Sequence, residues 1–209
     1  MQNYLGNKTL IALGLPRSGT TMCKQVFRQI FKNVLFTHTI GEEFNDIDLF
    51  IVRDVRDAVV SLKQTEKFHF ERIEKEEDLD VILNYNFVLD AANNIFPRVK
   101  EDSIVLRYEM FTQNKESIYN FIEDNFNVIL SDDLKKKITL ETSVEANKEI
   151  QKQFGDFSKY DFDSGIHGNH LNGGEIGKWR KLIPQKFHKA FCEKLRNRIG
   201  DEAYEFFIL

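Results

Sequence analysis

Residues 9–21 hold a short apolar run, a glycine-bearing loop and the start of a helical pattern, and this order constrains the fold more than any other feature. The apolar run at 9–13, with its β-branched members, predicts a buried parallel strand that ends at Gly14. Apolar residues at helical spacing follow the loop and predict a helix that begins near Ser18. A loop between a strand and a helix N-terminus favours phosphate binding, because the N–H groups of the first helical turn and the helix dipole face the anion.

The loop itself, PRSGTT at residues 16–21, carries the side chains that a phosphate site needs. Gly14 and Gly19 allow positive φ and a close approach of the backbone. Hydroxyl donors come from Ser18, Thr20 and Thr21. A Walker A loop ends in Gly-Lys-Ser/Thr, whereas Thr20 follows Gly19 here and the cation, Arg17, comes before the glycine. This order weakens the case for an ATP or GTP site, and an ordinary turn between strand and helix is the other interpretation.

The composition is typical of a globular protein, with 42% hydrophobic and 30% charged residues among 209. This length, without a repeat or a linker, predicts one domain over residues 1–209. A net charge of -4 argues against nucleic acid or a membrane as a partner, so an anion site must be a local cluster of cations. A cytoplasmic location is expected, because the sequence lacks a long apolar run and a signal-peptide pattern and has only two distant cysteines.

Short apolar runs alternate with helical segments along the chain. This alternation predicts a three-layer αβα fold with a central parallel sheet. At least four strands are expected, at 9–13, 34–37, 48–53 and 103–107. Helical periodicity begins at 57 and returns at 79–96, 115–126, 131–138 and 184–199. The charged segment 63–80 is predicted to be a solvated helix or surface segment, and the glycine-rich stretch 151–177 a functional or disordered loop.

A second candidate phosphate site follows the third predicted strand. Arg53 ends that strand, and Ser61 lies eight residues further on, inside the next predicted helix. A guanidinium fork and a hydroxyl together suit a phosphomonoester, which carries nearly two negative charges and three acceptor oxygens. The alternative is a surface salt-bridge cluster, because the charges alternate in sign at Arg53, Asp54, Arg56 and Asp57.

The PRSGTT loop closely resembles the 5′-phosphosulfate loop of sulfotransferases, which use 3′-phosphoadenosine 5′-phosphosulfate (PAPS) as sulfuryl donor. The spacing of Arg53, Asp57 and Ser61 resembles the site at which this family binds the 3′-phosphate. The resemblance implies a P-loop-NTPase-like sulfotransferase fold, of a small bacterial type. It also implies that the 5′-phosphosulfate is bound by Arg17, Ser18, Gly19, Thr20 and Thr21, and the 3′-phosphate by Arg53 and Ser61.

Two further segments are similar to family segments that lie near the adenosine. Tyr108-Glu109-Met110 resembles a Tyr-Glu-Asp segment whose tyrosine lies beside the adenosine, with Met110 in place of the final acid. Thr142-Ser143-Val144 resembles a Thr-Ser-Phe segment that contacts the adenine. Because Val144 replaces the aromatic residue, stacking on the base is not expected there.

The segment GGEIGKWR at 173–180 resembles the family motif Arg-Lys-Gly-x-x-Gly-Asp-Trp-Lys near the C-terminus. Gly174, Gly177 and Trp179 align, and Lys178 stands at the position of the aspartate, which makes Gly174 and Lys178 candidates for nucleotide binding. The Arg-Lys pair that holds the 3′-phosphate in cytosolic members is replaced by Asn172 and Gly173. The missing charge could come from His170, Lys178 or Arg180. We expect Trp179 to be structural, packing this loop against the domain.

The resemblance implies transfer of a sulfuryl group from PAPS to a hydroxyl or amine of a small-molecule or glycan acceptor, with release of the bisphosphate PAP. Arg17 would stabilise the leaving phosphate, and His38, at the end of the second strand, matches the position of the family's catalytic base. Glu42 or Glu43 is the rival base, and a mere strand cap is the other role open to His38. This chemistry requires no metal ion. Whether the chain is a monomer or a homodimer stays open, and the alternative functions are a P-loop nucleotide kinase and an inactive nucleotide-binding module.

Overall fold

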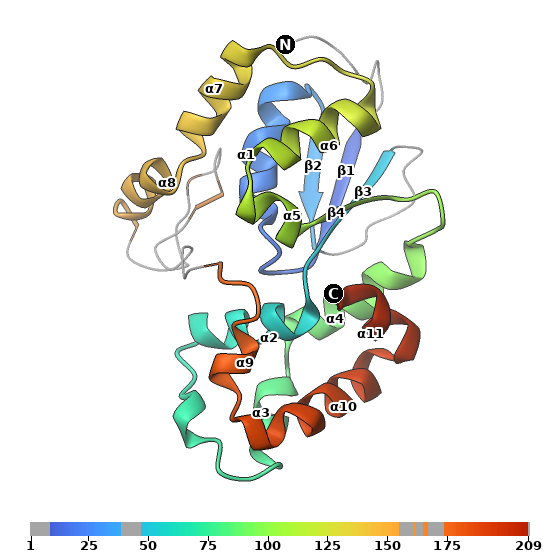
Figure 1. The fold of residues 1–209 in the computed structure, drawn as a ribbon, viewed down its shortest axis with the longest axis vertical. Coiled ribbons are helices and arrows are strands. Elements are labelled where there is room, and N and C mark those ends of the chain that lie inside the picture. The colour runs from blue at the N-terminus through green and yellow to red at the C-terminus, as the bar shows by residue number, and fades with distance from the viewer. Residues whose placement is uncertain (1–8, 39–46, 155–160, 162–164, 167–173, 209) are drawn as a thin grey trace.

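The computed structural model describes residues 9–38, 47–154, 161, 165–166 and 174–208. Its centre is one parallel sheet of four strands in the order β2-β1-β3-β4 (Figure 1). The strands are β1 (Leu10–Gly14), β2 (Val34–Thr37), β3 (Ile47–Val52) and β4 (Ile104–Arg107). Each lies within one residue of the strand predicted from its apolar run. The predicted parallel sheet is therefore confirmed.

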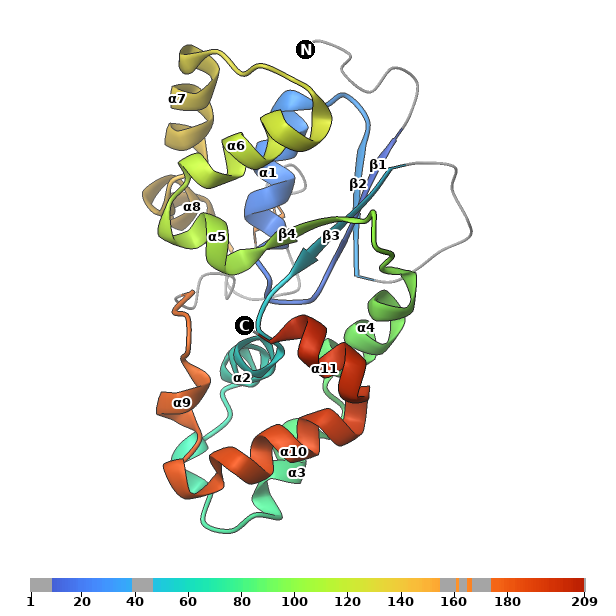
Figure 2. The same cartoon turned by 45° about the vertical axis from the view of Figure 1, so that its right-hand side comes forward.

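The side chains of the central strands alternate between the two faces of the sheet, and each face is covered by its own helices. Leu10 and Ala12 of β1 pack in one hydrophobic core, while Ile11 and Leu13 pack in the other. The first face is covered by α1 (Thr20–Ile30), α5 (Tyr108–Gln113), α6 (Glu116–Phe126) and α7 (Asp132–Glu141). The second face is covered by α2 (Val55–Thr65), α3 (Asp78–Leu83), α4 (Phe87–Ile95), α9 (Trp179–Leu182), α10 (His188–Ile199) and α11 (Asp201–Phe207). The two groups of helices are seen apart in Figure 2, which confirms the predicted three-layer α/β fold.

The remaining short elements connect these layers. Helix α8 (Val144–Gln151) follows α7, and its start is capped by Ser143, whose side chain accepts a hydrogen bond from the N–H of Ala146. The 3₁₀ turns are η1 (Phe70–Arg72), η2 (Phe96–Arg98) and η3 (Gln185–Phe187). None of the helices in the described ranges combines the length and the apolar composition that crossing a membrane requires.

The segment 79–96 was expected to form one helix, and this expectation is wrong. The chain breaks between α3 and α4, where Tyr85 has a left-handed backbone with φ of 50°. Asn86 stabilises the break, because its side chain donates to the carbonyl of Ile82 and accepts from the N–H of Val88. A short polar side chain that bonds nearby backbone groups competes with helix continuation.

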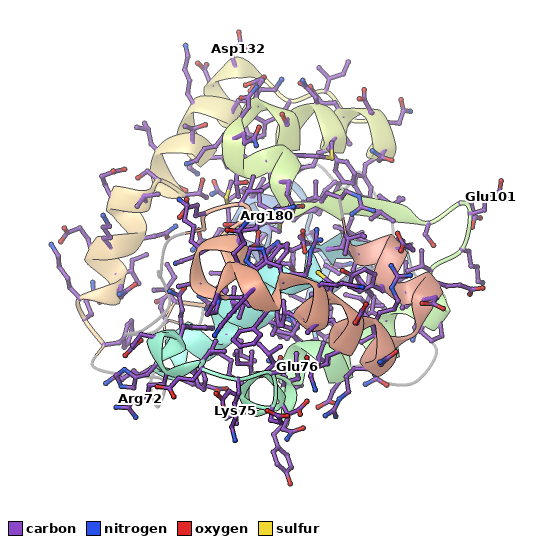
Figure 3. All side chains as sticks on the ribbon, turned by 60° about the horizontal axis from the view of Figure 1, so that its bottom comes forward. Arg72, Lys75, Glu76, Glu101, Asp132 and Arg180 are labelled. Atoms are coloured by element: carbon purple, nitrogen blue, oxygen red, sulfur yellow. The ribbon has the colours of Figure 1, made fainter. Side chains whose placement is uncertain are left out.

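The charged segment after α2 is on the surface, as predicted, but it is also anchored. Arg72, Lys75 and Glu76 project from one edge of the molecule (Figure 3). On either side of Arg72 in the chain, Phe70 and Ile73 are buried in the core of the second face. The two apolar residues therefore fix a segment whose other side chains are solvated.

Candidate functional site

The loop between β1 and α1 has the backbone shape of an anion-binding turn. Arg17 and Gly19 both have left-handed backbones, with φ of 69° and 76°, and α1 begins at Thr20. The first turn of α1 leaves N–H groups without intrahelical partners, and these point out of the helix end toward the loop. Left-handed arginine is strained, and strain of this kind is concentrated at functional sites.

Ser18 holds this loop together from the inside and does not face outward as a phosphate donor. It is fully buried, and its hydroxyl lies within hydrogen-bonding distance of two carbonyl oxygens, that of Leu15 at 2.6 Å and that of Ile51 at 3.1 Å. Its N–H also points to the carbonyl of Leu15, at 3.2 Å. Thr20 and Thr21, in contrast, are half-buried at the start of α1. Within this loop, the hydroxyl donors available to a ligand are therefore the two threonines.

The two predicted phosphate sites meet in the structure. Arg17 Nε donates to Ser61 Oγ at 3.3 Å, although the two residues are far apart in the chain. Arg53 Nη1 donates to the carbonyl oxygen of Arg17 at 2.9 Å. The loop after β1 and the Arg53–Ser61 segment after β3 therefore form one site at the carboxyl ends of neighbouring strands, where ligands of open α/β sheets bind.

Three cations, Arg17, Arg53 and Lys178, form what we call the cation cluster. Burial lowers the pKa of Arg17, and the positive charge of Arg53 lowers it further. Burial also lowers the pKa of Lys178; Glu175 opposes this effect, while Arg53 and then Arg17 reinforce it. The three groups thus repel one another at close range, and a bound anion would relieve this repulsion.

Tyr108 connects this cluster to the C-terminal segment. The guanidinium of Arg53 lies 4.3 Å above the centre of the Tyr108 ring, and the Tyr108 hydroxyl donates to the carbonyl of Gly174 at 3.0 Å. Arg53 Nη2 donates to the carbonyl of Glu175 at 3.0 Å. A Cβ atom at position 174 would overlap the Tyr108 hydroxyl, so the contact requires glycine.

The charged residues around Arg53 are buried, so the alternative of a surface salt-bridge cluster is wrong. Arg53, Asp54 and Asp57 are 2%, 4% and 0% exposed. Asp54 and Arg56 do form an ion pair, at 2.6 Å, and the Arg56 guanidinium then stacks on the Trp179 ring at 4.8 Å. Trp179 itself is buried in the core of the second face, in the structural position expected for it.

His38 lies at the end of β2, beside the start of the phosphate loop. Its Nδ1 is 2.5 Å from the carbonyl oxygen of Gly14, and its ring meets Phe87 edge-on, with centres 6.2 Å apart. Burial lowers the pKa of His38, although the bond to Gly14 partly opposes this. The rival bases Glu42 and Glu43, like His170, Asn172 and Gly173, lie outside the described residues.

The Thr142-Ser143-Val144 segment lies between α7 and α8, and its hydroxyls serve the helices. Thr142 Oγ1 donates to the carbonyl of Ile138, and Ser143 caps α8. The side chain of Asn147 on α8 is paired with that of Gln25 on α1 through two amide hydrogen bonds, at 3.0 and 3.3 Å. The segment is therefore held near the helix that starts at the phosphate loop.

Two buried acids at this site were not predicted as functional residues. Asp57 accepts hydrogen bonds from two backbone N–H groups, those of Gly177 and Trp179. Glu109 accepts one from the N–H of Asp54 at 2.9 Å, and burial raises its pKa. Asp57 is part of the Arg53–Ser61 spacing and Glu109 follows Tyr108 in the sequence, but neither position reveals which backbone groups these acids bind.

Comparison with known proteins identifies the fold that carries this site. Neither a protein-family model nor a curated protein sequence matches the chain. Among solved structures, the crystal structure of mouse sulfotransferase SULT7A1 complexed with PAP is similar, with a TM-score of 0.66 over 97% of this chain and 90% of that one. The chain has the sulfotransferase fold. The sequence identity to the mouse protein is 15%, so the likeness concerns the fold alone.

Within this sulfotransferase fold, the chemistry of the site follows from its own side chains. The first turn of α1, Arg17 and Arg53 offer N–H donors and positive charge at one point. His38, whose pKa is lowered by burial, contacts the carbonyl of Gly14 at the start of the loop. Such an arrangement can bind a polyanion and, beside it, accept a proton.

Proposed function

We propose that this chain is a sulfotransferase that moves the sulfuryl group of PAPS to a hydroxyl or amine of a small-molecule or glycan acceptor and releases PAP. The observation that carries this proposal is the contact between the two candidate phosphate sites through Arg17, Ser61 and Arg53. PAP carries its two phosphate groups on one ribose, so a protein that binds it needs two adjacent anion sites. A nucleotide with a single phosphate chain would leave the second anion site empty.

The leaving phosphate would be bound by Arg17 and by the first turn of α1. As the bond between sulfur and the bridging oxygen breaks, negative charge grows on the 5′-phosphate. Fixed donors aimed at such charge typically contribute a few kcal/mol each to transition-state stabilisation, roughly 3 per donor. In-line geometry supplies the rest of the rate enhancement, because the acceptor attacks sulfur from the side opposite to the leaving phosphate.

His38 would act as general base on the acceptor side. The carbonyl of Gly14 can only accept a hydrogen bond, so Nδ1 carries the ring proton and Nε2 is left as the basic nitrogen. The acceptor oxygen or nitrogen then bonds to sulfur while its proton moves to Nε2 of His38. No metal ion takes part in this step.

The 3′-phosphate would be read by Arg53 and Ser61, with Lys178 supplying the charge that the Arg-Lys pair provides in cytosolic sulfotransferases. The Arg53 guanidinium is held over the Tyr108 ring, 4.3 Å from its centre, which reduces the entropy lost when it binds an anion. Its Nε is buried and has no partner among the described residues, so Arg53 retains hydrogen-bonding capacity. These features favour a ligand with a second phosphate over a mononucleotide.

Radiolabelled PAPS, incubated with a panel of phenols, aliphatic alcohols, amines and oligosaccharides, tests the proposal. We expect label to move to at least one class of acceptor, with release of PAP. Arg17→Ala should abolish this transfer, whereas Arg72, which is exposed at an edge of the molecule in Figure 3, gives a matched control as Arg72→Ala. Turnover of ATP in place of PAPS would identify a kinase, and PAP binding without any transfer would identify an inactive module; either result contradicts the proposal.

A further inference from the structure

We propose that Asp57 is a positioning residue that aims Lys178 at the 3′-phosphate; the inference rests on the proposed function. Asp57 is fully buried in the first turn of α2. Its Oδ2 accepts from the N–H of Gly177 at 2.6 Å, and its Oδ1 accepts from the N–H of Trp179 at 2.9 Å. One carboxylate therefore clamps the two residues that flank Lys178, with both of its oxygens in use.

The clamp depends on the local backbone. Gly177 has φ of 74°, a left-handed turn that favours glycine, and this turn lets two N–H groups that are two residues apart reach one side chain. Burial raises the pKa of Asp57, while the two N–H groups that it binds and the positive charge of Arg53 oppose this effect. Two more contacts hold the same segment, from Tyr108 to Gly174 and from Arg53 to Glu175.

Because Asp57 holds both Gly177 and Trp179, the backbone position of Lys178 between them is fixed. Arg53 Nη2 donates to the carbonyl of Glu175, three residues before Lys178. The side chain of Lys178 therefore starts close to Arg53, the residue assigned to the 3′-phosphate. A lysine held at this point can replace one charge of the Arg-Lys pair that this chain lacks.

Arg180, the other described candidate for that charge, is engaged elsewhere. Its guanidinium lies 4.7 Å from the centre of the Trp179 ring, and the residue is exposed on α9 (Figure 3). Lys178 lies between the two clamped residues, whereas the Arg180 guanidinium lies against the Trp179 ring. This division makes Lys178 the better source of the missing charge.

A double-mutant cycle between Asp57→Asn and Lys178→Ala tests the inference, with binding of PAP and of 5′-AMP measured by calorimetry. Asparagine has one acceptor oxygen in place of two, so the clamp loses one hydrogen bond. We expect Asp57→Asn to weaken PAP binding about 10-fold, as for loss of one charge-assisted contact, and 5′-AMP binding by less than about 2-fold. In the Lys178→Ala background, Asp57→Asn should weaken PAP binding no further.

Each other outcome contradicts the inference. Equal losses for PAP and 5′-AMP, or losses that add to those of Lys178→Ala, would show that Asp57 serves the fold alone. Asp57→Glu keeps the charge and both oxygens but is one methylene group longer, so it displaces the backbone that it clamps; if Asp57→Asn does not fold, this milder variant must show the same selective loss of PAP affinity. A wild-type protein that binds no PAP overturns the proposed function itself, whereas PAP binding without coupling between the two residues overturns only the role of Asp57.

Discussion

Nδ1 of His38 lies 2.5 Å from the carbonyl oxygen of Gly14, the last residue of β1. This contact joins the end of β2 to the start of the phosphate loop, so a candidate base is held beside a candidate leaving-group site. It also fixes the tautomer of the ring, since a carbonyl can only accept a hydrogen bond. Burial lowers the pKa of His38, which favours the neutral ring, whose Nε2 can accept a proton.

His38→Ala should lower turnover of PAPS by about 100-fold or more, the usual effect of losing a general base. PAP affinity should barely change, because a base on the acceptor side does not contact the leaving nucleotide. Steady-state kinetics and calorimetry measure the two quantities, and His69→Ala, which changes an exposed histidine paired with Glu71, is the control. If His38→Ala stays active while Glu42→Ala or Glu43→Ala abolishes turnover, the base is a carboxylate.

The pH profile of turnover should report the depressed pKa of His38. A lowered pKa keeps the imidazole neutral to lower pH, so activity should be lost only as the pH falls below the ordinary histidine value of about 6.5. The profile of kcat/KM against pH measures the midpoint of this acidic limb. A midpoint above the ordinary value would show that the titrating base is not this histidine.

Two variants of Arg17 should separate its charge from its strained backbone. Arg17→Ala and Arg17→Gly both remove the guanidinium, so each should lower PAP affinity about 10-fold or more and also lower turnover. Only glycine accepts φ of 69° without strain, so Arg17→Gly should be more stable than Arg17→Ala by about 1 kcal/mol, or roughly 2–4 °C in Tm. Equal melting temperatures would show that the loop relaxes around the residue.

Gly174→Ala should disturb the site through Tyr108. The new Cβ would overlap the Tyr108 hydroxyl, so the C-terminal segment or the tyrosine must move, and both Tm and PAP affinity should fall. Adding Tyr108→Phe removes that oxygen and should restore part of the loss, since the next atom, Cζ, is 3.0 Å away.

Gly177→Ala is the control for this rescue. Among the described residues its Cβ would meet only Arg180 Nη1, at 3.5 Å, and its cost comes from the φ of 74°. Tyr108→Phe should therefore not rescue Gly177→Ala. For Gly174 itself, the losses of Tm and PAP affinity caused by Gly174→Ala and by Tyr108→Phe should not simply add in the double variant. If they do add, the two residues are not coupled.

The sheet could be predicted from the sequence because buried parallel strands are short, continuous apolar runs. The break between α3 and α4 could not, because Asn86 sits in an otherwise helical pattern and acts through two hydrogen bonds that its spacing does not reveal. Helix α5, with six residues, is too short to give a periodic signal. Short elements of this kind depend on packing rather than on pattern.

At the site, the motifs located Arg17, Arg53, Ser61 and Tyr108 in one place, because each follows a strand of the same parallel sheet. The sequence does not reveal, however, in which direction the side chains at the site point. Ser18 has the same hydroxyl as its neighbours, yet it faces the backbone of Leu15. Asp57 was visible only as part of a spacing, because the N–H groups that it binds lie more than a hundred residues away in the chain.

Calorimetric titration of the wild-type protein with PAP and with 5′-AMP tests the central claim most directly, since the two ligands differ by the 3′-phosphate alone. Two or more charge-assisted contacts to that phosphate should make PAP bind about 100-fold more tightly. Arg53→Ala should remove most of this difference while the protein stays folded. Equal affinities for PAP and 5′-AMP in the wild-type protein would contradict the account.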